Sequence, residues 1–144
     1  MNISRILAVK GMGVVTIHPD QTVREALLIF AQRNIGSLVV VDPPGKIVGI
    51  LSERDIIRNL ARDETIFSEP VNKLMTRDVI TAVPEDDLTS VANTMTERRI
   101  RHLPVVRESV LIGIVSIGDV VKAQRDTYLG EVDTLQTQLV EGDI

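Results

Sequence analysis

The chain contains no cysteine and no tryptophan, and aromatic residues make up only 2% of its 144 residues. The absence of cysteine excludes a disulfide framework and thiolate chemistry. A net charge of −4 with so few aromatics argues against a general nucleic-acid binder, which usually combines a basic stripe with stacking aromatics. No apolar run approaches the roughly 18 residues that span a bilayer, and residues 1–15 lack the apolar core of a signal peptide. We therefore expect a cytoplasmic protein with no membrane or nucleic-acid partner.

Two stretches of the chain share one pattern. Residues 47–57 have the sequence IVGILSERDII, and residues 111–121 have the sequence LIGIVSIGDVV. In both, a β-branched apolar run with one glycine is typical of a buried strand. The Ser-x-x-Asp that follows is typical of a helix N-terminus. Each copy is therefore predicted to be a strand that turns directly into a helix, with a hydroxyl and a carboxylate at the turn.

The rest of the chain repeats around these two stretches. The matched pairs are Pro19 and Pro84, Ile35 and Ile100, Leu38 and Leu103, Val41 and Val106, Gly49 and Gly113, Ser52 and Ser116, and Asp55 and Asp119. Two copies of one β-α-β-β-α unit predict an α/β (α+β) fold with two pseudo-symmetric halves. Because neither half could bury both faces of its sheet alone, we expect the halves to pack sheet to sheet. The expected division is 1–66, 67–129 and a C-terminal helical extension over 130–144.

Local patterns predict the individual elements. Thr22 and Glu25 form a capping box that opens a helix, and residues 34–36 close it with asparagine and glycine. Residues 38–41 are apolar on both faces, which predicts a central strand, and residues 42–45 supply the proline and glycine of a tight turn. We also expect short helices over 2–8 and 71–75, short strands over 14–17 and 79–81, and a helix over 53–61.

A longer helix is expected after Asp119. An apolar stripe near heptad spacing is formed there by Val121, Tyr128, Val132, Leu135 and Leu139. Gly130 and the polar end at 142–143 weaken this pattern. The stripe fits two interpretations that the sequence leaves open: a surface helix packed on its own domain, or a contact between two copies of the chain.

The two Ser-x-x-Asp turns also fit two interpretations. Each would be only a helix cap, worth roughly 1 kcal/mol, if it served stability alone. Both turns, however, follow a buried strand at the carboxyl edge where α/β folds bind ligands. A helix N-terminus suits phosphate, and a fixed carboxylate beside it suits the two hydroxyls of a ribose. The duplicated turn therefore predicts two half-sites for a nucleotide.

A basic cluster lies in the second copy only. Its members are Arg98, Arg99, Arg101, His102 and Arg107. Arg98 and Arg99 fit a solvated helix face. Arg101 and His102 lie where the chain leaves a helix to enter a strand, near the second Ser-x-x-Asp turn. Gly36 and Ser37 occupy the matching positions of the first copy and carry no charge. The halves are thus expected to share a ribose-binding feature but not a phosphate-binding one.

These motifs resemble a tandem pair of cystathionine-β-synthase (CBS) domains, often called a Bateman module. The resemblance extends from about Val15 to Val121. It is carried by residues 16–19 (TIHP), 35–41 (IGSLVVV), 49–55 (GILSERD), 81–84 (TAVP), 101–106 (RHLPVV) and 113–119 (GIVSIGD). Single motifs of this family are weak, but both repeats in order are highly specific. The arrangement is most similar to small bacterial stand-alone CBS-pair proteins with no attached enzyme or channel.

The resemblance implies a cleft with two quasi-equivalent sites for adenosine-containing ligands such as AMP, ADP, ATP, S-adenosylmethionine or NAD(H). It implies that the motif aspartate holds the ribose, that Thr-x-x-Pro flanks the base, and that basic residues before Leu-Pro-Val hold phosphate. The stronger site then comprises Thr81, Ala82, Pro84, Ile100, Arg101, His102, Leu103, Pro104, Ser116, Gly118 and Asp119. The other site comprises Thr16, Ile17, Pro19, Ile35, Gly36, Ser37, Ser52, Arg54 and Asp55. Phosphate binding in that site requires Arg54 or a residue of the other half.

We therefore expect a regulatory module that binds AMP or a related adenosine nucleotide, requires no metal, and changes conformation or partner binding. An enzyme is disfavoured, because the sequence offers no nucleophile–base pair, metal cluster or glycine-rich phosphate loop. The alternative is a structural or interaction protein with vestigial ligand sites. Family members often form homodimers, which implies a homodimer here, and a regulated target protein would lie on another chain.

Overall fold

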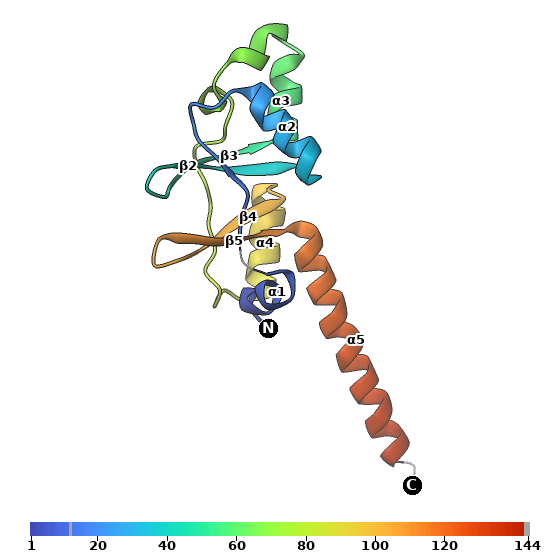
Figure 1. Ribbon diagram of the computed structural model, residues 1–144. Coiled ribbons are helices and arrows are strands. Elements are labelled where there is room, and N and C mark those ends of the chain that lie inside the picture. Colours follow the sequence, from blue (N-terminus) through green and yellow to red (C-terminus); the bar gives the residue numbers. More distant parts are fainter. Residues whose placement is uncertain (12, 143–144) are drawn as a thin grey trace.

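A computed structural model describes residues 1–11 and 13–142, with side chains to residue 130 (Figure 1). The helices are α1 (Ile3–Lys10), α2 (Val23–Arg33), α3 (Glu53–Leu60), α4 (Leu88–Arg98) and α5 (Ile117–Gly142), with 3₁₀ turns η1 (Glu64–Ser68) and η2 (Val71–Lys73). The strands are β1 (Thr16–Ile17), β2 (Ser37–Asp42), β3 (Lys46–Ser52), β4 (His102–Arg107) and β5 (Val110–Ser116). The predicted mixed fold of two repeats, each with its own small sheet, is confirmed.

The two hairpins share one register. β2 pairs antiparallel with β3, and β4 pairs antiparallel with β5. Each ladder has an irregularity at the same place, between Val40 and Val41 in the first repeat and between Val105 and Val106 in the second. Bulges re-aim the end of a strand, so their duplication gives both hairpins the same shape and brings both Ser-x-x-Asp turns to equivalent positions.

The first strand of the second repeat differs from expectation. β1 pairs in parallel with β2, but residues 79–81 form no strand, and the segment makes a single parallel bridge between Ala82 and Val105. The amide of Ala82 donates to the carbonyl of Pro104, and the amide of Val106 donates to the carbonyl of Ala82. Extending this ladder in either direction would need the N–H of Pro84 or of Pro104, which proline lacks. The ladder therefore stops at one residue.

The repeats exchange their leading segments in space. α1 packs into the core of the second repeat through Ile3, Ile6 and Leu7, which are at most 7% exposed. The segment 71–75 packs into the core of the first repeat. In each case a glycine gives the segment room on the sheet: Gly49 lies under Met75, and Gly113 lies under Leu7. Each repeat is thus covered by the piece of chain that precedes the other repeat.

The two sheets lie against each other, as Figure 1 shows, with α2 and α3 beyond one sheet and α1 and α4 beyond the other. Val39 illustrates the packing of the inner face. It lies on the opposite face of β2 from Leu38 and Val40, belongs to neither repeat's core, and is still fully buried. The expected sheet-to-sheet arrangement of the repeats is therefore present.

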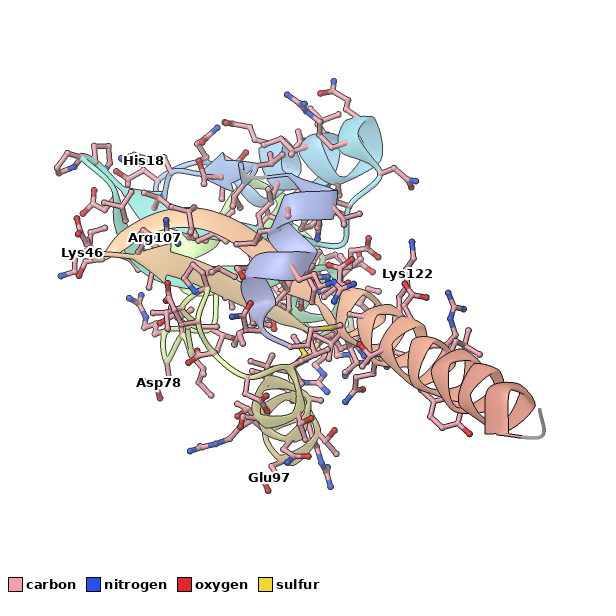
Figure 2. All side chains as sticks on the ribbon, turned by 90° about the horizontal axis from the view of Figure 1, so that it is seen from below. His18, Lys46, Asp78, Glu97, Arg107 and Lys122 are labelled. Atoms are coloured by element: carbon pink, nitrogen blue, oxygen red, sulfur yellow. The ribbon has the colours of Figure 1, made fainter. Side chains whose placement is uncertain are left out.

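The last helix leaves the body of the protein. The first turns of α5 pack beside α1 and α4, and the rest runs away from both sheets (Figure 2). Val121 and Tyr128 of the expected apolar stripe are 55% and 64% exposed, while the side chains of Val132, Leu135 and Leu139 lie outside the described residues. Among the helices described, none is long and apolar enough to cross a membrane.

Candidate functional site

The first Ser-x-x-Asp turn is a complete capping box at the start of α3. The amide of Asp55 donates to Ser52 Oγ at 3.2 Å, and the amide of Ser52 donates to Asp55 Oδ2 at 2.9 Å. The amide of Glu53 donates to the carbonyl of Gly36 at 3.0 Å, which ties the turn to the start of β2. These bonds fix the orientation of the Asp55 carboxylate at the end of a buried strand. We name this the first corner, residues 52–55.

The second turn repeats this geometry at the start of α5. The amide of Asp119 donates to Ser116 Oγ at 3.1 Å, the amide of Ser116 donates to Asp119 Oδ2 at 2.8 Å, and the amide of Ile117 donates to the carbonyl of Arg101 at 2.8 Å. This second corner, residues 116–119, differs in one respect. The ammonium of Lys10 lies 2.6 Å from Asp119 Oδ2.

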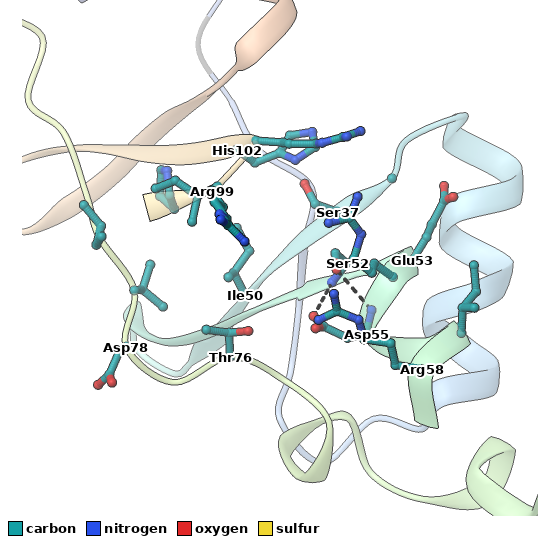
Figure 3. A pocket seen from close by; sticks show the side chains of 18 residues that line it. Ser37, Ile50, Ser52, Glu53, Asp55, Arg58, Thr76, Asp78, Arg99 and His102 are labelled. Atoms are coloured by element: carbon teal, nitrogen blue, oxygen red, sulfur yellow. Dashed lines mark hydrogen bonds between the residues drawn. The ribbon is translucent and has the colours of Figure 1, made fainter. Parts of the chain in front are cut away.

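A cavity of about 870 Å³ opens at the first corner (Figure 3). The first repeat lines it with Gly36, Ser37, Ile50, Ser52, Glu53, Arg54, Asp55, Ile57 and Arg58, the linking segment with Thr76, Asp78, Val79 and Ile80, and the second repeat with Arg99, Ile100, Arg101, His102 and Pro104. Its volume lies in the range of cavities that hold small ligands, roughly 300–1,000 Å³. Because both repeats line it, a ligand there would bridge them.

The cavity carries more positive than negative groups. Four arginines line it, against the carboxylates of Glu53, Asp55 and Asp78. Arginine is always charged and donates in a planar fork that matches phosphate. The cavity wall can therefore hold an anion beside the fixed carboxylate of the first corner.

His102 lies between the two corners. It begins β4 opposite Ser116 and also lines the cavity. Burial lowers the pKa of His102, and the charges of Lys10 and Arg101 lower it further, against an opposing effect of Asp119. The imidazole is therefore neutral at neutral pH, able to donate from one nitrogen and accept at the other.

Apolar side chains line the rest of the cavity. Val79, Ile80 and Ile100 are half-buried, and Ile57 is 65% exposed at its edge. Covering such an exposed aliphatic side chain with a flat apolar ligand is favourable, because it removes apolar surface from water. The cavity therefore combines a carboxylate, basic groups and an apolar wall.

The structure groups the predicted residues differently from the sequence. Arg101 and His102 were expected beside Ser116 and Asp119, but they line the cavity together with Asp55. The cavity lining unites nine predicted residues, namely Gly36, Ser37, Ser52, Arg54, Asp55, Ile100, Arg101, His102 and Pro104. Basic residues of the other half thus lie at the cavity of the first corner, and phosphate binding there stays a prediction.

Other predicted residues lie outside this lining. Ile17 and Leu103 are each 2% exposed and pack in the cores, and Ala82 is buried in its bridge to Val105. Thr16 and Thr81 are exposed, Ile35 is half-buried against the first core, Gly118 lies in the first turn of α5, and the carbonyls of Pro19 and Pro84 accept amide hydrogen bonds. Their part in binding stays a prediction.

Sequence reasoning missed the other half of the lining, which comprises Ile50, Glu53, Ile57 and Arg58 of the first repeat, Thr76, Asp78, Val79 and Ile80 of the linking segment, and Arg99. Arg99 fitted a solvated helix face, but it ends α4 in the left-handed conformation, with φ 55°, and lines the cavity. The sequence predicts a short strand over 79–81, but no motif in residues 76–80 marks them as part of a site. Thr76 reaches the site by pairing with Ile50 at the open edge of β3, a contact between segments far apart in the sequence.

The described side chains form no cluster that could act as a metal site. Among the side chains described, in residues 1–11 and 13–130, no group of three or more His, Asp or Glu is arranged to hold a metal ion.

Comparison with known proteins agrees with this architecture. The CBS domain family matches residues 9–62 and 71–126. The mitochondrial CBS domain-containing protein CBSX3 of Arabidopsis thaliana is 37% identical over 128 residues, which cover 85% of this chain and 62% of that protein. The chain thus spans less than two thirds of that relative.

Solved structures share the fold over nearly their whole length. The CBS-domain containing protein ATU1752 from Agrobacterium tumefaciens has 35% identity and a TM-score of 0.83, covering 86% of this chain and 99% of that one. The CBS domain pair of protein MJ0100, solved in complex with 5′-methylthioadenosine and S-adenosyl-L-methionine, has 30% identity and a TM-score of 0.78, covering 88% and 98%. With two matched repeats and these neighbours, the chain belongs to the CBS-domain family and contains a tandem pair of CBS domains.

Proposed function

We propose that the cavity binds an adenosine nucleotide that carries phosphate, and that the chain is a regulatory module rather than an enzyme. One observation carries this proposal. A single cavity brings the first corner, with Ser52 and Asp55, together with Arg99, Arg101 and His102 of the other repeat. A carboxylate, a cationic wall and an apolar surface are the three features that a nucleotide's sugar, phosphate and base require.

Each feature has a proposed role. Asp55 accepts hydrogen bonds from the ribose hydroxyls, since only one of its oxygens is used by the backbone amide of Ser52. Val79, Ile80 and Ile100 contact the base. Arg101 and the neutral His102 donate to phosphate, and Arg54 and Arg99 add positive charge. Charge-assisted hydrogen bonds of this kind are about twice as strong as neutral ones.

The charge of the cavity narrows the ligand class. The crystallised MJ0100 pair holds 5′-methylthioadenosine and S-adenosyl-L-methionine, which supports an adenosine ligand in this family. Neither of those molecules carries phosphate, whereas four arginines line the cavity of this chain. We therefore favour AMP, ADP or ATP over a sulfonium ligand.

Ligand binding would be converted into a signal by bridging the repeats. A ligand shifts a conformational equilibrium only by its difference in affinity for the two states, and a ligand held by both repeats and by residues 76–80 has such a difference whenever the repeats move apart. We further expect a homodimer in the cytoplasm that acts on a separate target protein. The exposed Tyr128 and Leu129 of α5 offer apolar surface for such contacts.

Isothermal calorimetry with AMP, ATP, adenosine and S-adenosylmethionine tests the proposal. The wild type is expected to bind AMP, and Asp55→Asn is expected to weaken this binding about tenfold or more through loss of a charged acceptor. Asp78→Asn is the control, because it removes a carboxylate from the same cavity but not from the corner. Absence of nucleotide binding, or equal affinities of the wild type and Asp55→Asn, would refute the proposed function.

A further inference from the structure

The two corners are alike in backbone and in capping bonds, so the groups around their two carboxylates can be compared directly. Each aspartate Oδ2 accepts the amide of its own serine, at 2.9 Å for Asp55 and at 2.8 Å for Asp119. Each serine Oγ accepts the amide of its aspartate. On this evidence alone, both carboxylates would be equally able to accept a ribose.

Lys10 breaks the equivalence. It is the last residue of α1, and its ammonium donates to Asp119 Oδ2 at 2.6 Å and to the carbonyl of Ile114 at 2.9 Å. In the first repeat the matching carbonyl, that of Ile50, accepts the amide of Thr76 at 2.9 Å. No cation pairs with Asp55 among the residues that the structure describes. The side chain of Lys10 thus pairs with the acceptor groups of the second corner. At the first corner, the matching carbonyl pairs instead with a backbone amide of the linking segment.

This contact uses the acceptor sites that a ribose would need. A carboxylate oxygen has about two lone-pair sites, and Asp119 Oδ2 already accepts both the amide of Ser116 and the ammonium of Lys10. A ribose diol hydrogen bonds to a carboxylate through both oxygens, so only Oδ1 of Asp119 would be open to it. At Asp55, Oδ1 and one site of Oδ2 are both open.

Lys10 is positioned by the fold. Ile3, Ile6 and Leu7 anchor α1 in the second core, and just beyond Lys10 the amide of Gly13 donates to the carbonyl of Ile112 at 3.0 Å. The lysine is therefore held on both sides against the edge of β5. Burial raises the pKa of Asp119, but hydrogen bonds from Lys10 and Ser116 and the charge of Lys10 outweigh it, so the pKa of Asp119 is lowered.

From this geometry we propose that Lys10 is an internal occupant of the second corner, so that the chain binds one nucleotide, at the first corner, until Lys10 leaves Asp119. The inference rests on the proposed function and adds a regulatory element to it. The segment around α1 then regulates the second site, because any event that moves Lys10 away from Asp119 opens it.

Calorimetric titration with AMP measures the stoichiometry directly. The wild type and Lys10→Arg are expected to bind one AMP per chain, since arginine keeps the cation on Asp119. Lys10→Ala is expected to bind two, with affinity at the second corner raised about fivefold or more through loss of a half-exposed ion pair. Lys73→Ala, which removes a lysine from the exposed pair with Glu69, is the control and is expected to bind one.

Two further measurements separate the possible outcomes. The double variant Lys10→Ala/Asp119→Asn is expected to lose the second site again. In protein without ligand, a carbon-13 titration of the Asp119 carboxyl is expected to show a higher pKa in Lys10→Ala than in the wild type. Two equal sites in the wild type, one site in Lys10→Ala, or an unchanged Asp119 pKa would each overturn the inference while leaving the first-corner site intact. Absence of AMP binding in every variant would instead refute the proposed function and the inference with it.

Discussion

Asp55 and His102 line the same cavity from different repeats (Figure 3). Asp55 is fixed by the cap of α3, and His102 is the first residue of β4. The first repeat supplies Asp55 with Arg54 and Arg58, and the second repeat supplies Arg99, Arg101 and His102, so the full set of basic groups around the carboxylate needs both repeats. Occupation of this cavity therefore depends on how the two repeats are placed relative to each other, which is the property that a regulatory module must be able to change.

Arg101→Gln separates phosphate recognition from recognition of the nucleoside. The substitution removes a charge-assisted contact, so AMP affinity is expected to fall roughly tenfold or more, while adenosine affinity changes by less than about twofold. Calorimetry with the two ligands measures the difference. Arg107→Gln is the control, since Arg107 pairs with Glu85 at 3.7 Å on the surface. Equal losses for AMP and adenosine would show that Arg101 does not contact the phosphate.

We expect the free energy of unfolding of the protein to depend on pH because of His102. Burial and the charges of Lys10 and Arg101 lower the pKa of His102 despite the opposing charge of Asp119. The folded state then binds fewer protons than the unfolded state, so stability is lost as the pH falls from about 6.5 toward the lower folded-state pKa, and no further below it.

Urea denaturation at several pH values measures this effect. Between pH 7.5 and 5, the wild type is expected to lose more free energy of unfolding than His102→Gln, which cannot titrate at that position. The matched control is His18→Gln, which replaces the chain's other histidine. Parallel pH profiles for the wild type and His102→Gln would contradict the lowered pKa.

Gly49→Ala and Gly113→Ala test the exchanged segments. A Cβ on Gly49 would lie 2.7 Å from Met75 Cγ and 3.0 Å from the backbone oxygen of Thr76, in addition to its contact with the Met75 sulfur. A Cβ on Gly113 would lie 2.7 Å from Cδ2 of Leu7, the far end of a flexible side chain. Since backbone yields less than a side chain, we expect Gly49→Ala to cost about 1–3 kcal/mol and Gly113→Ala less.

Denaturant unfolding of the two variants gives the comparison. Gly118→Ala is the control, because its Cβ would have no neighbour closer than 3.6 Å and the residue lies in the exposed first turn of α5. It is expected to be neutral or stabilising by up to about 1 kcal/mol. A larger loss for Gly113→Ala than for Gly49→Ala would contradict the argument.

Ile3→Ala tests the contribution of α1 to the second repeat. Ile3 is fully buried in the core formed with Leu103 and Val115, so its truncation is expected to cost about 2–5 kcal/mol. Val9→Ala on the same helix changes a side chain that is 84% exposed and is expected to stay within about 0.5 kcal/mol of the wild type. Thermal and urea unfolding measure both, and similar values for the two variants would mean that α1 is not part of the core.

Local patterns predicted most of the fold. The hairpins and both Ser-x-x-Asp caps depend on residues close in sequence, and the capping bonds of Asp55 and Asp119 form as their spacing indicated. The missing strand at 79–81 depends on register, because only the pairing of Ala82 with Val105 brings the amide-less Pro104 and Pro84 to the positions that would extend the ladder.

The composition of the cavity depends on how the repeats face each other. The sequence predicts that His102 lies near Asp119 of the same repeat. In the structure, His102 is the register partner of Ser116 on the neighbouring strand. It also lines the cavity at which Asp55 lies, across the interface between the repeats, and no periodicity within one repeat encodes that arrangement. The approach of Lys10 to Asp119 is likewise a contact between distant segments.

The second corner also forms the N-terminus of α5. This helix has 26 residues, so it is about 39 Å long at 1.5 Å per residue, and its free part runs away from the sheets (Figure 1). A tilt of about 10° at residues 116–119 would carry the far end through roughly 7 Å. A change at the Asp119 carboxylate that tilted this helix would therefore become a much larger displacement at its far end.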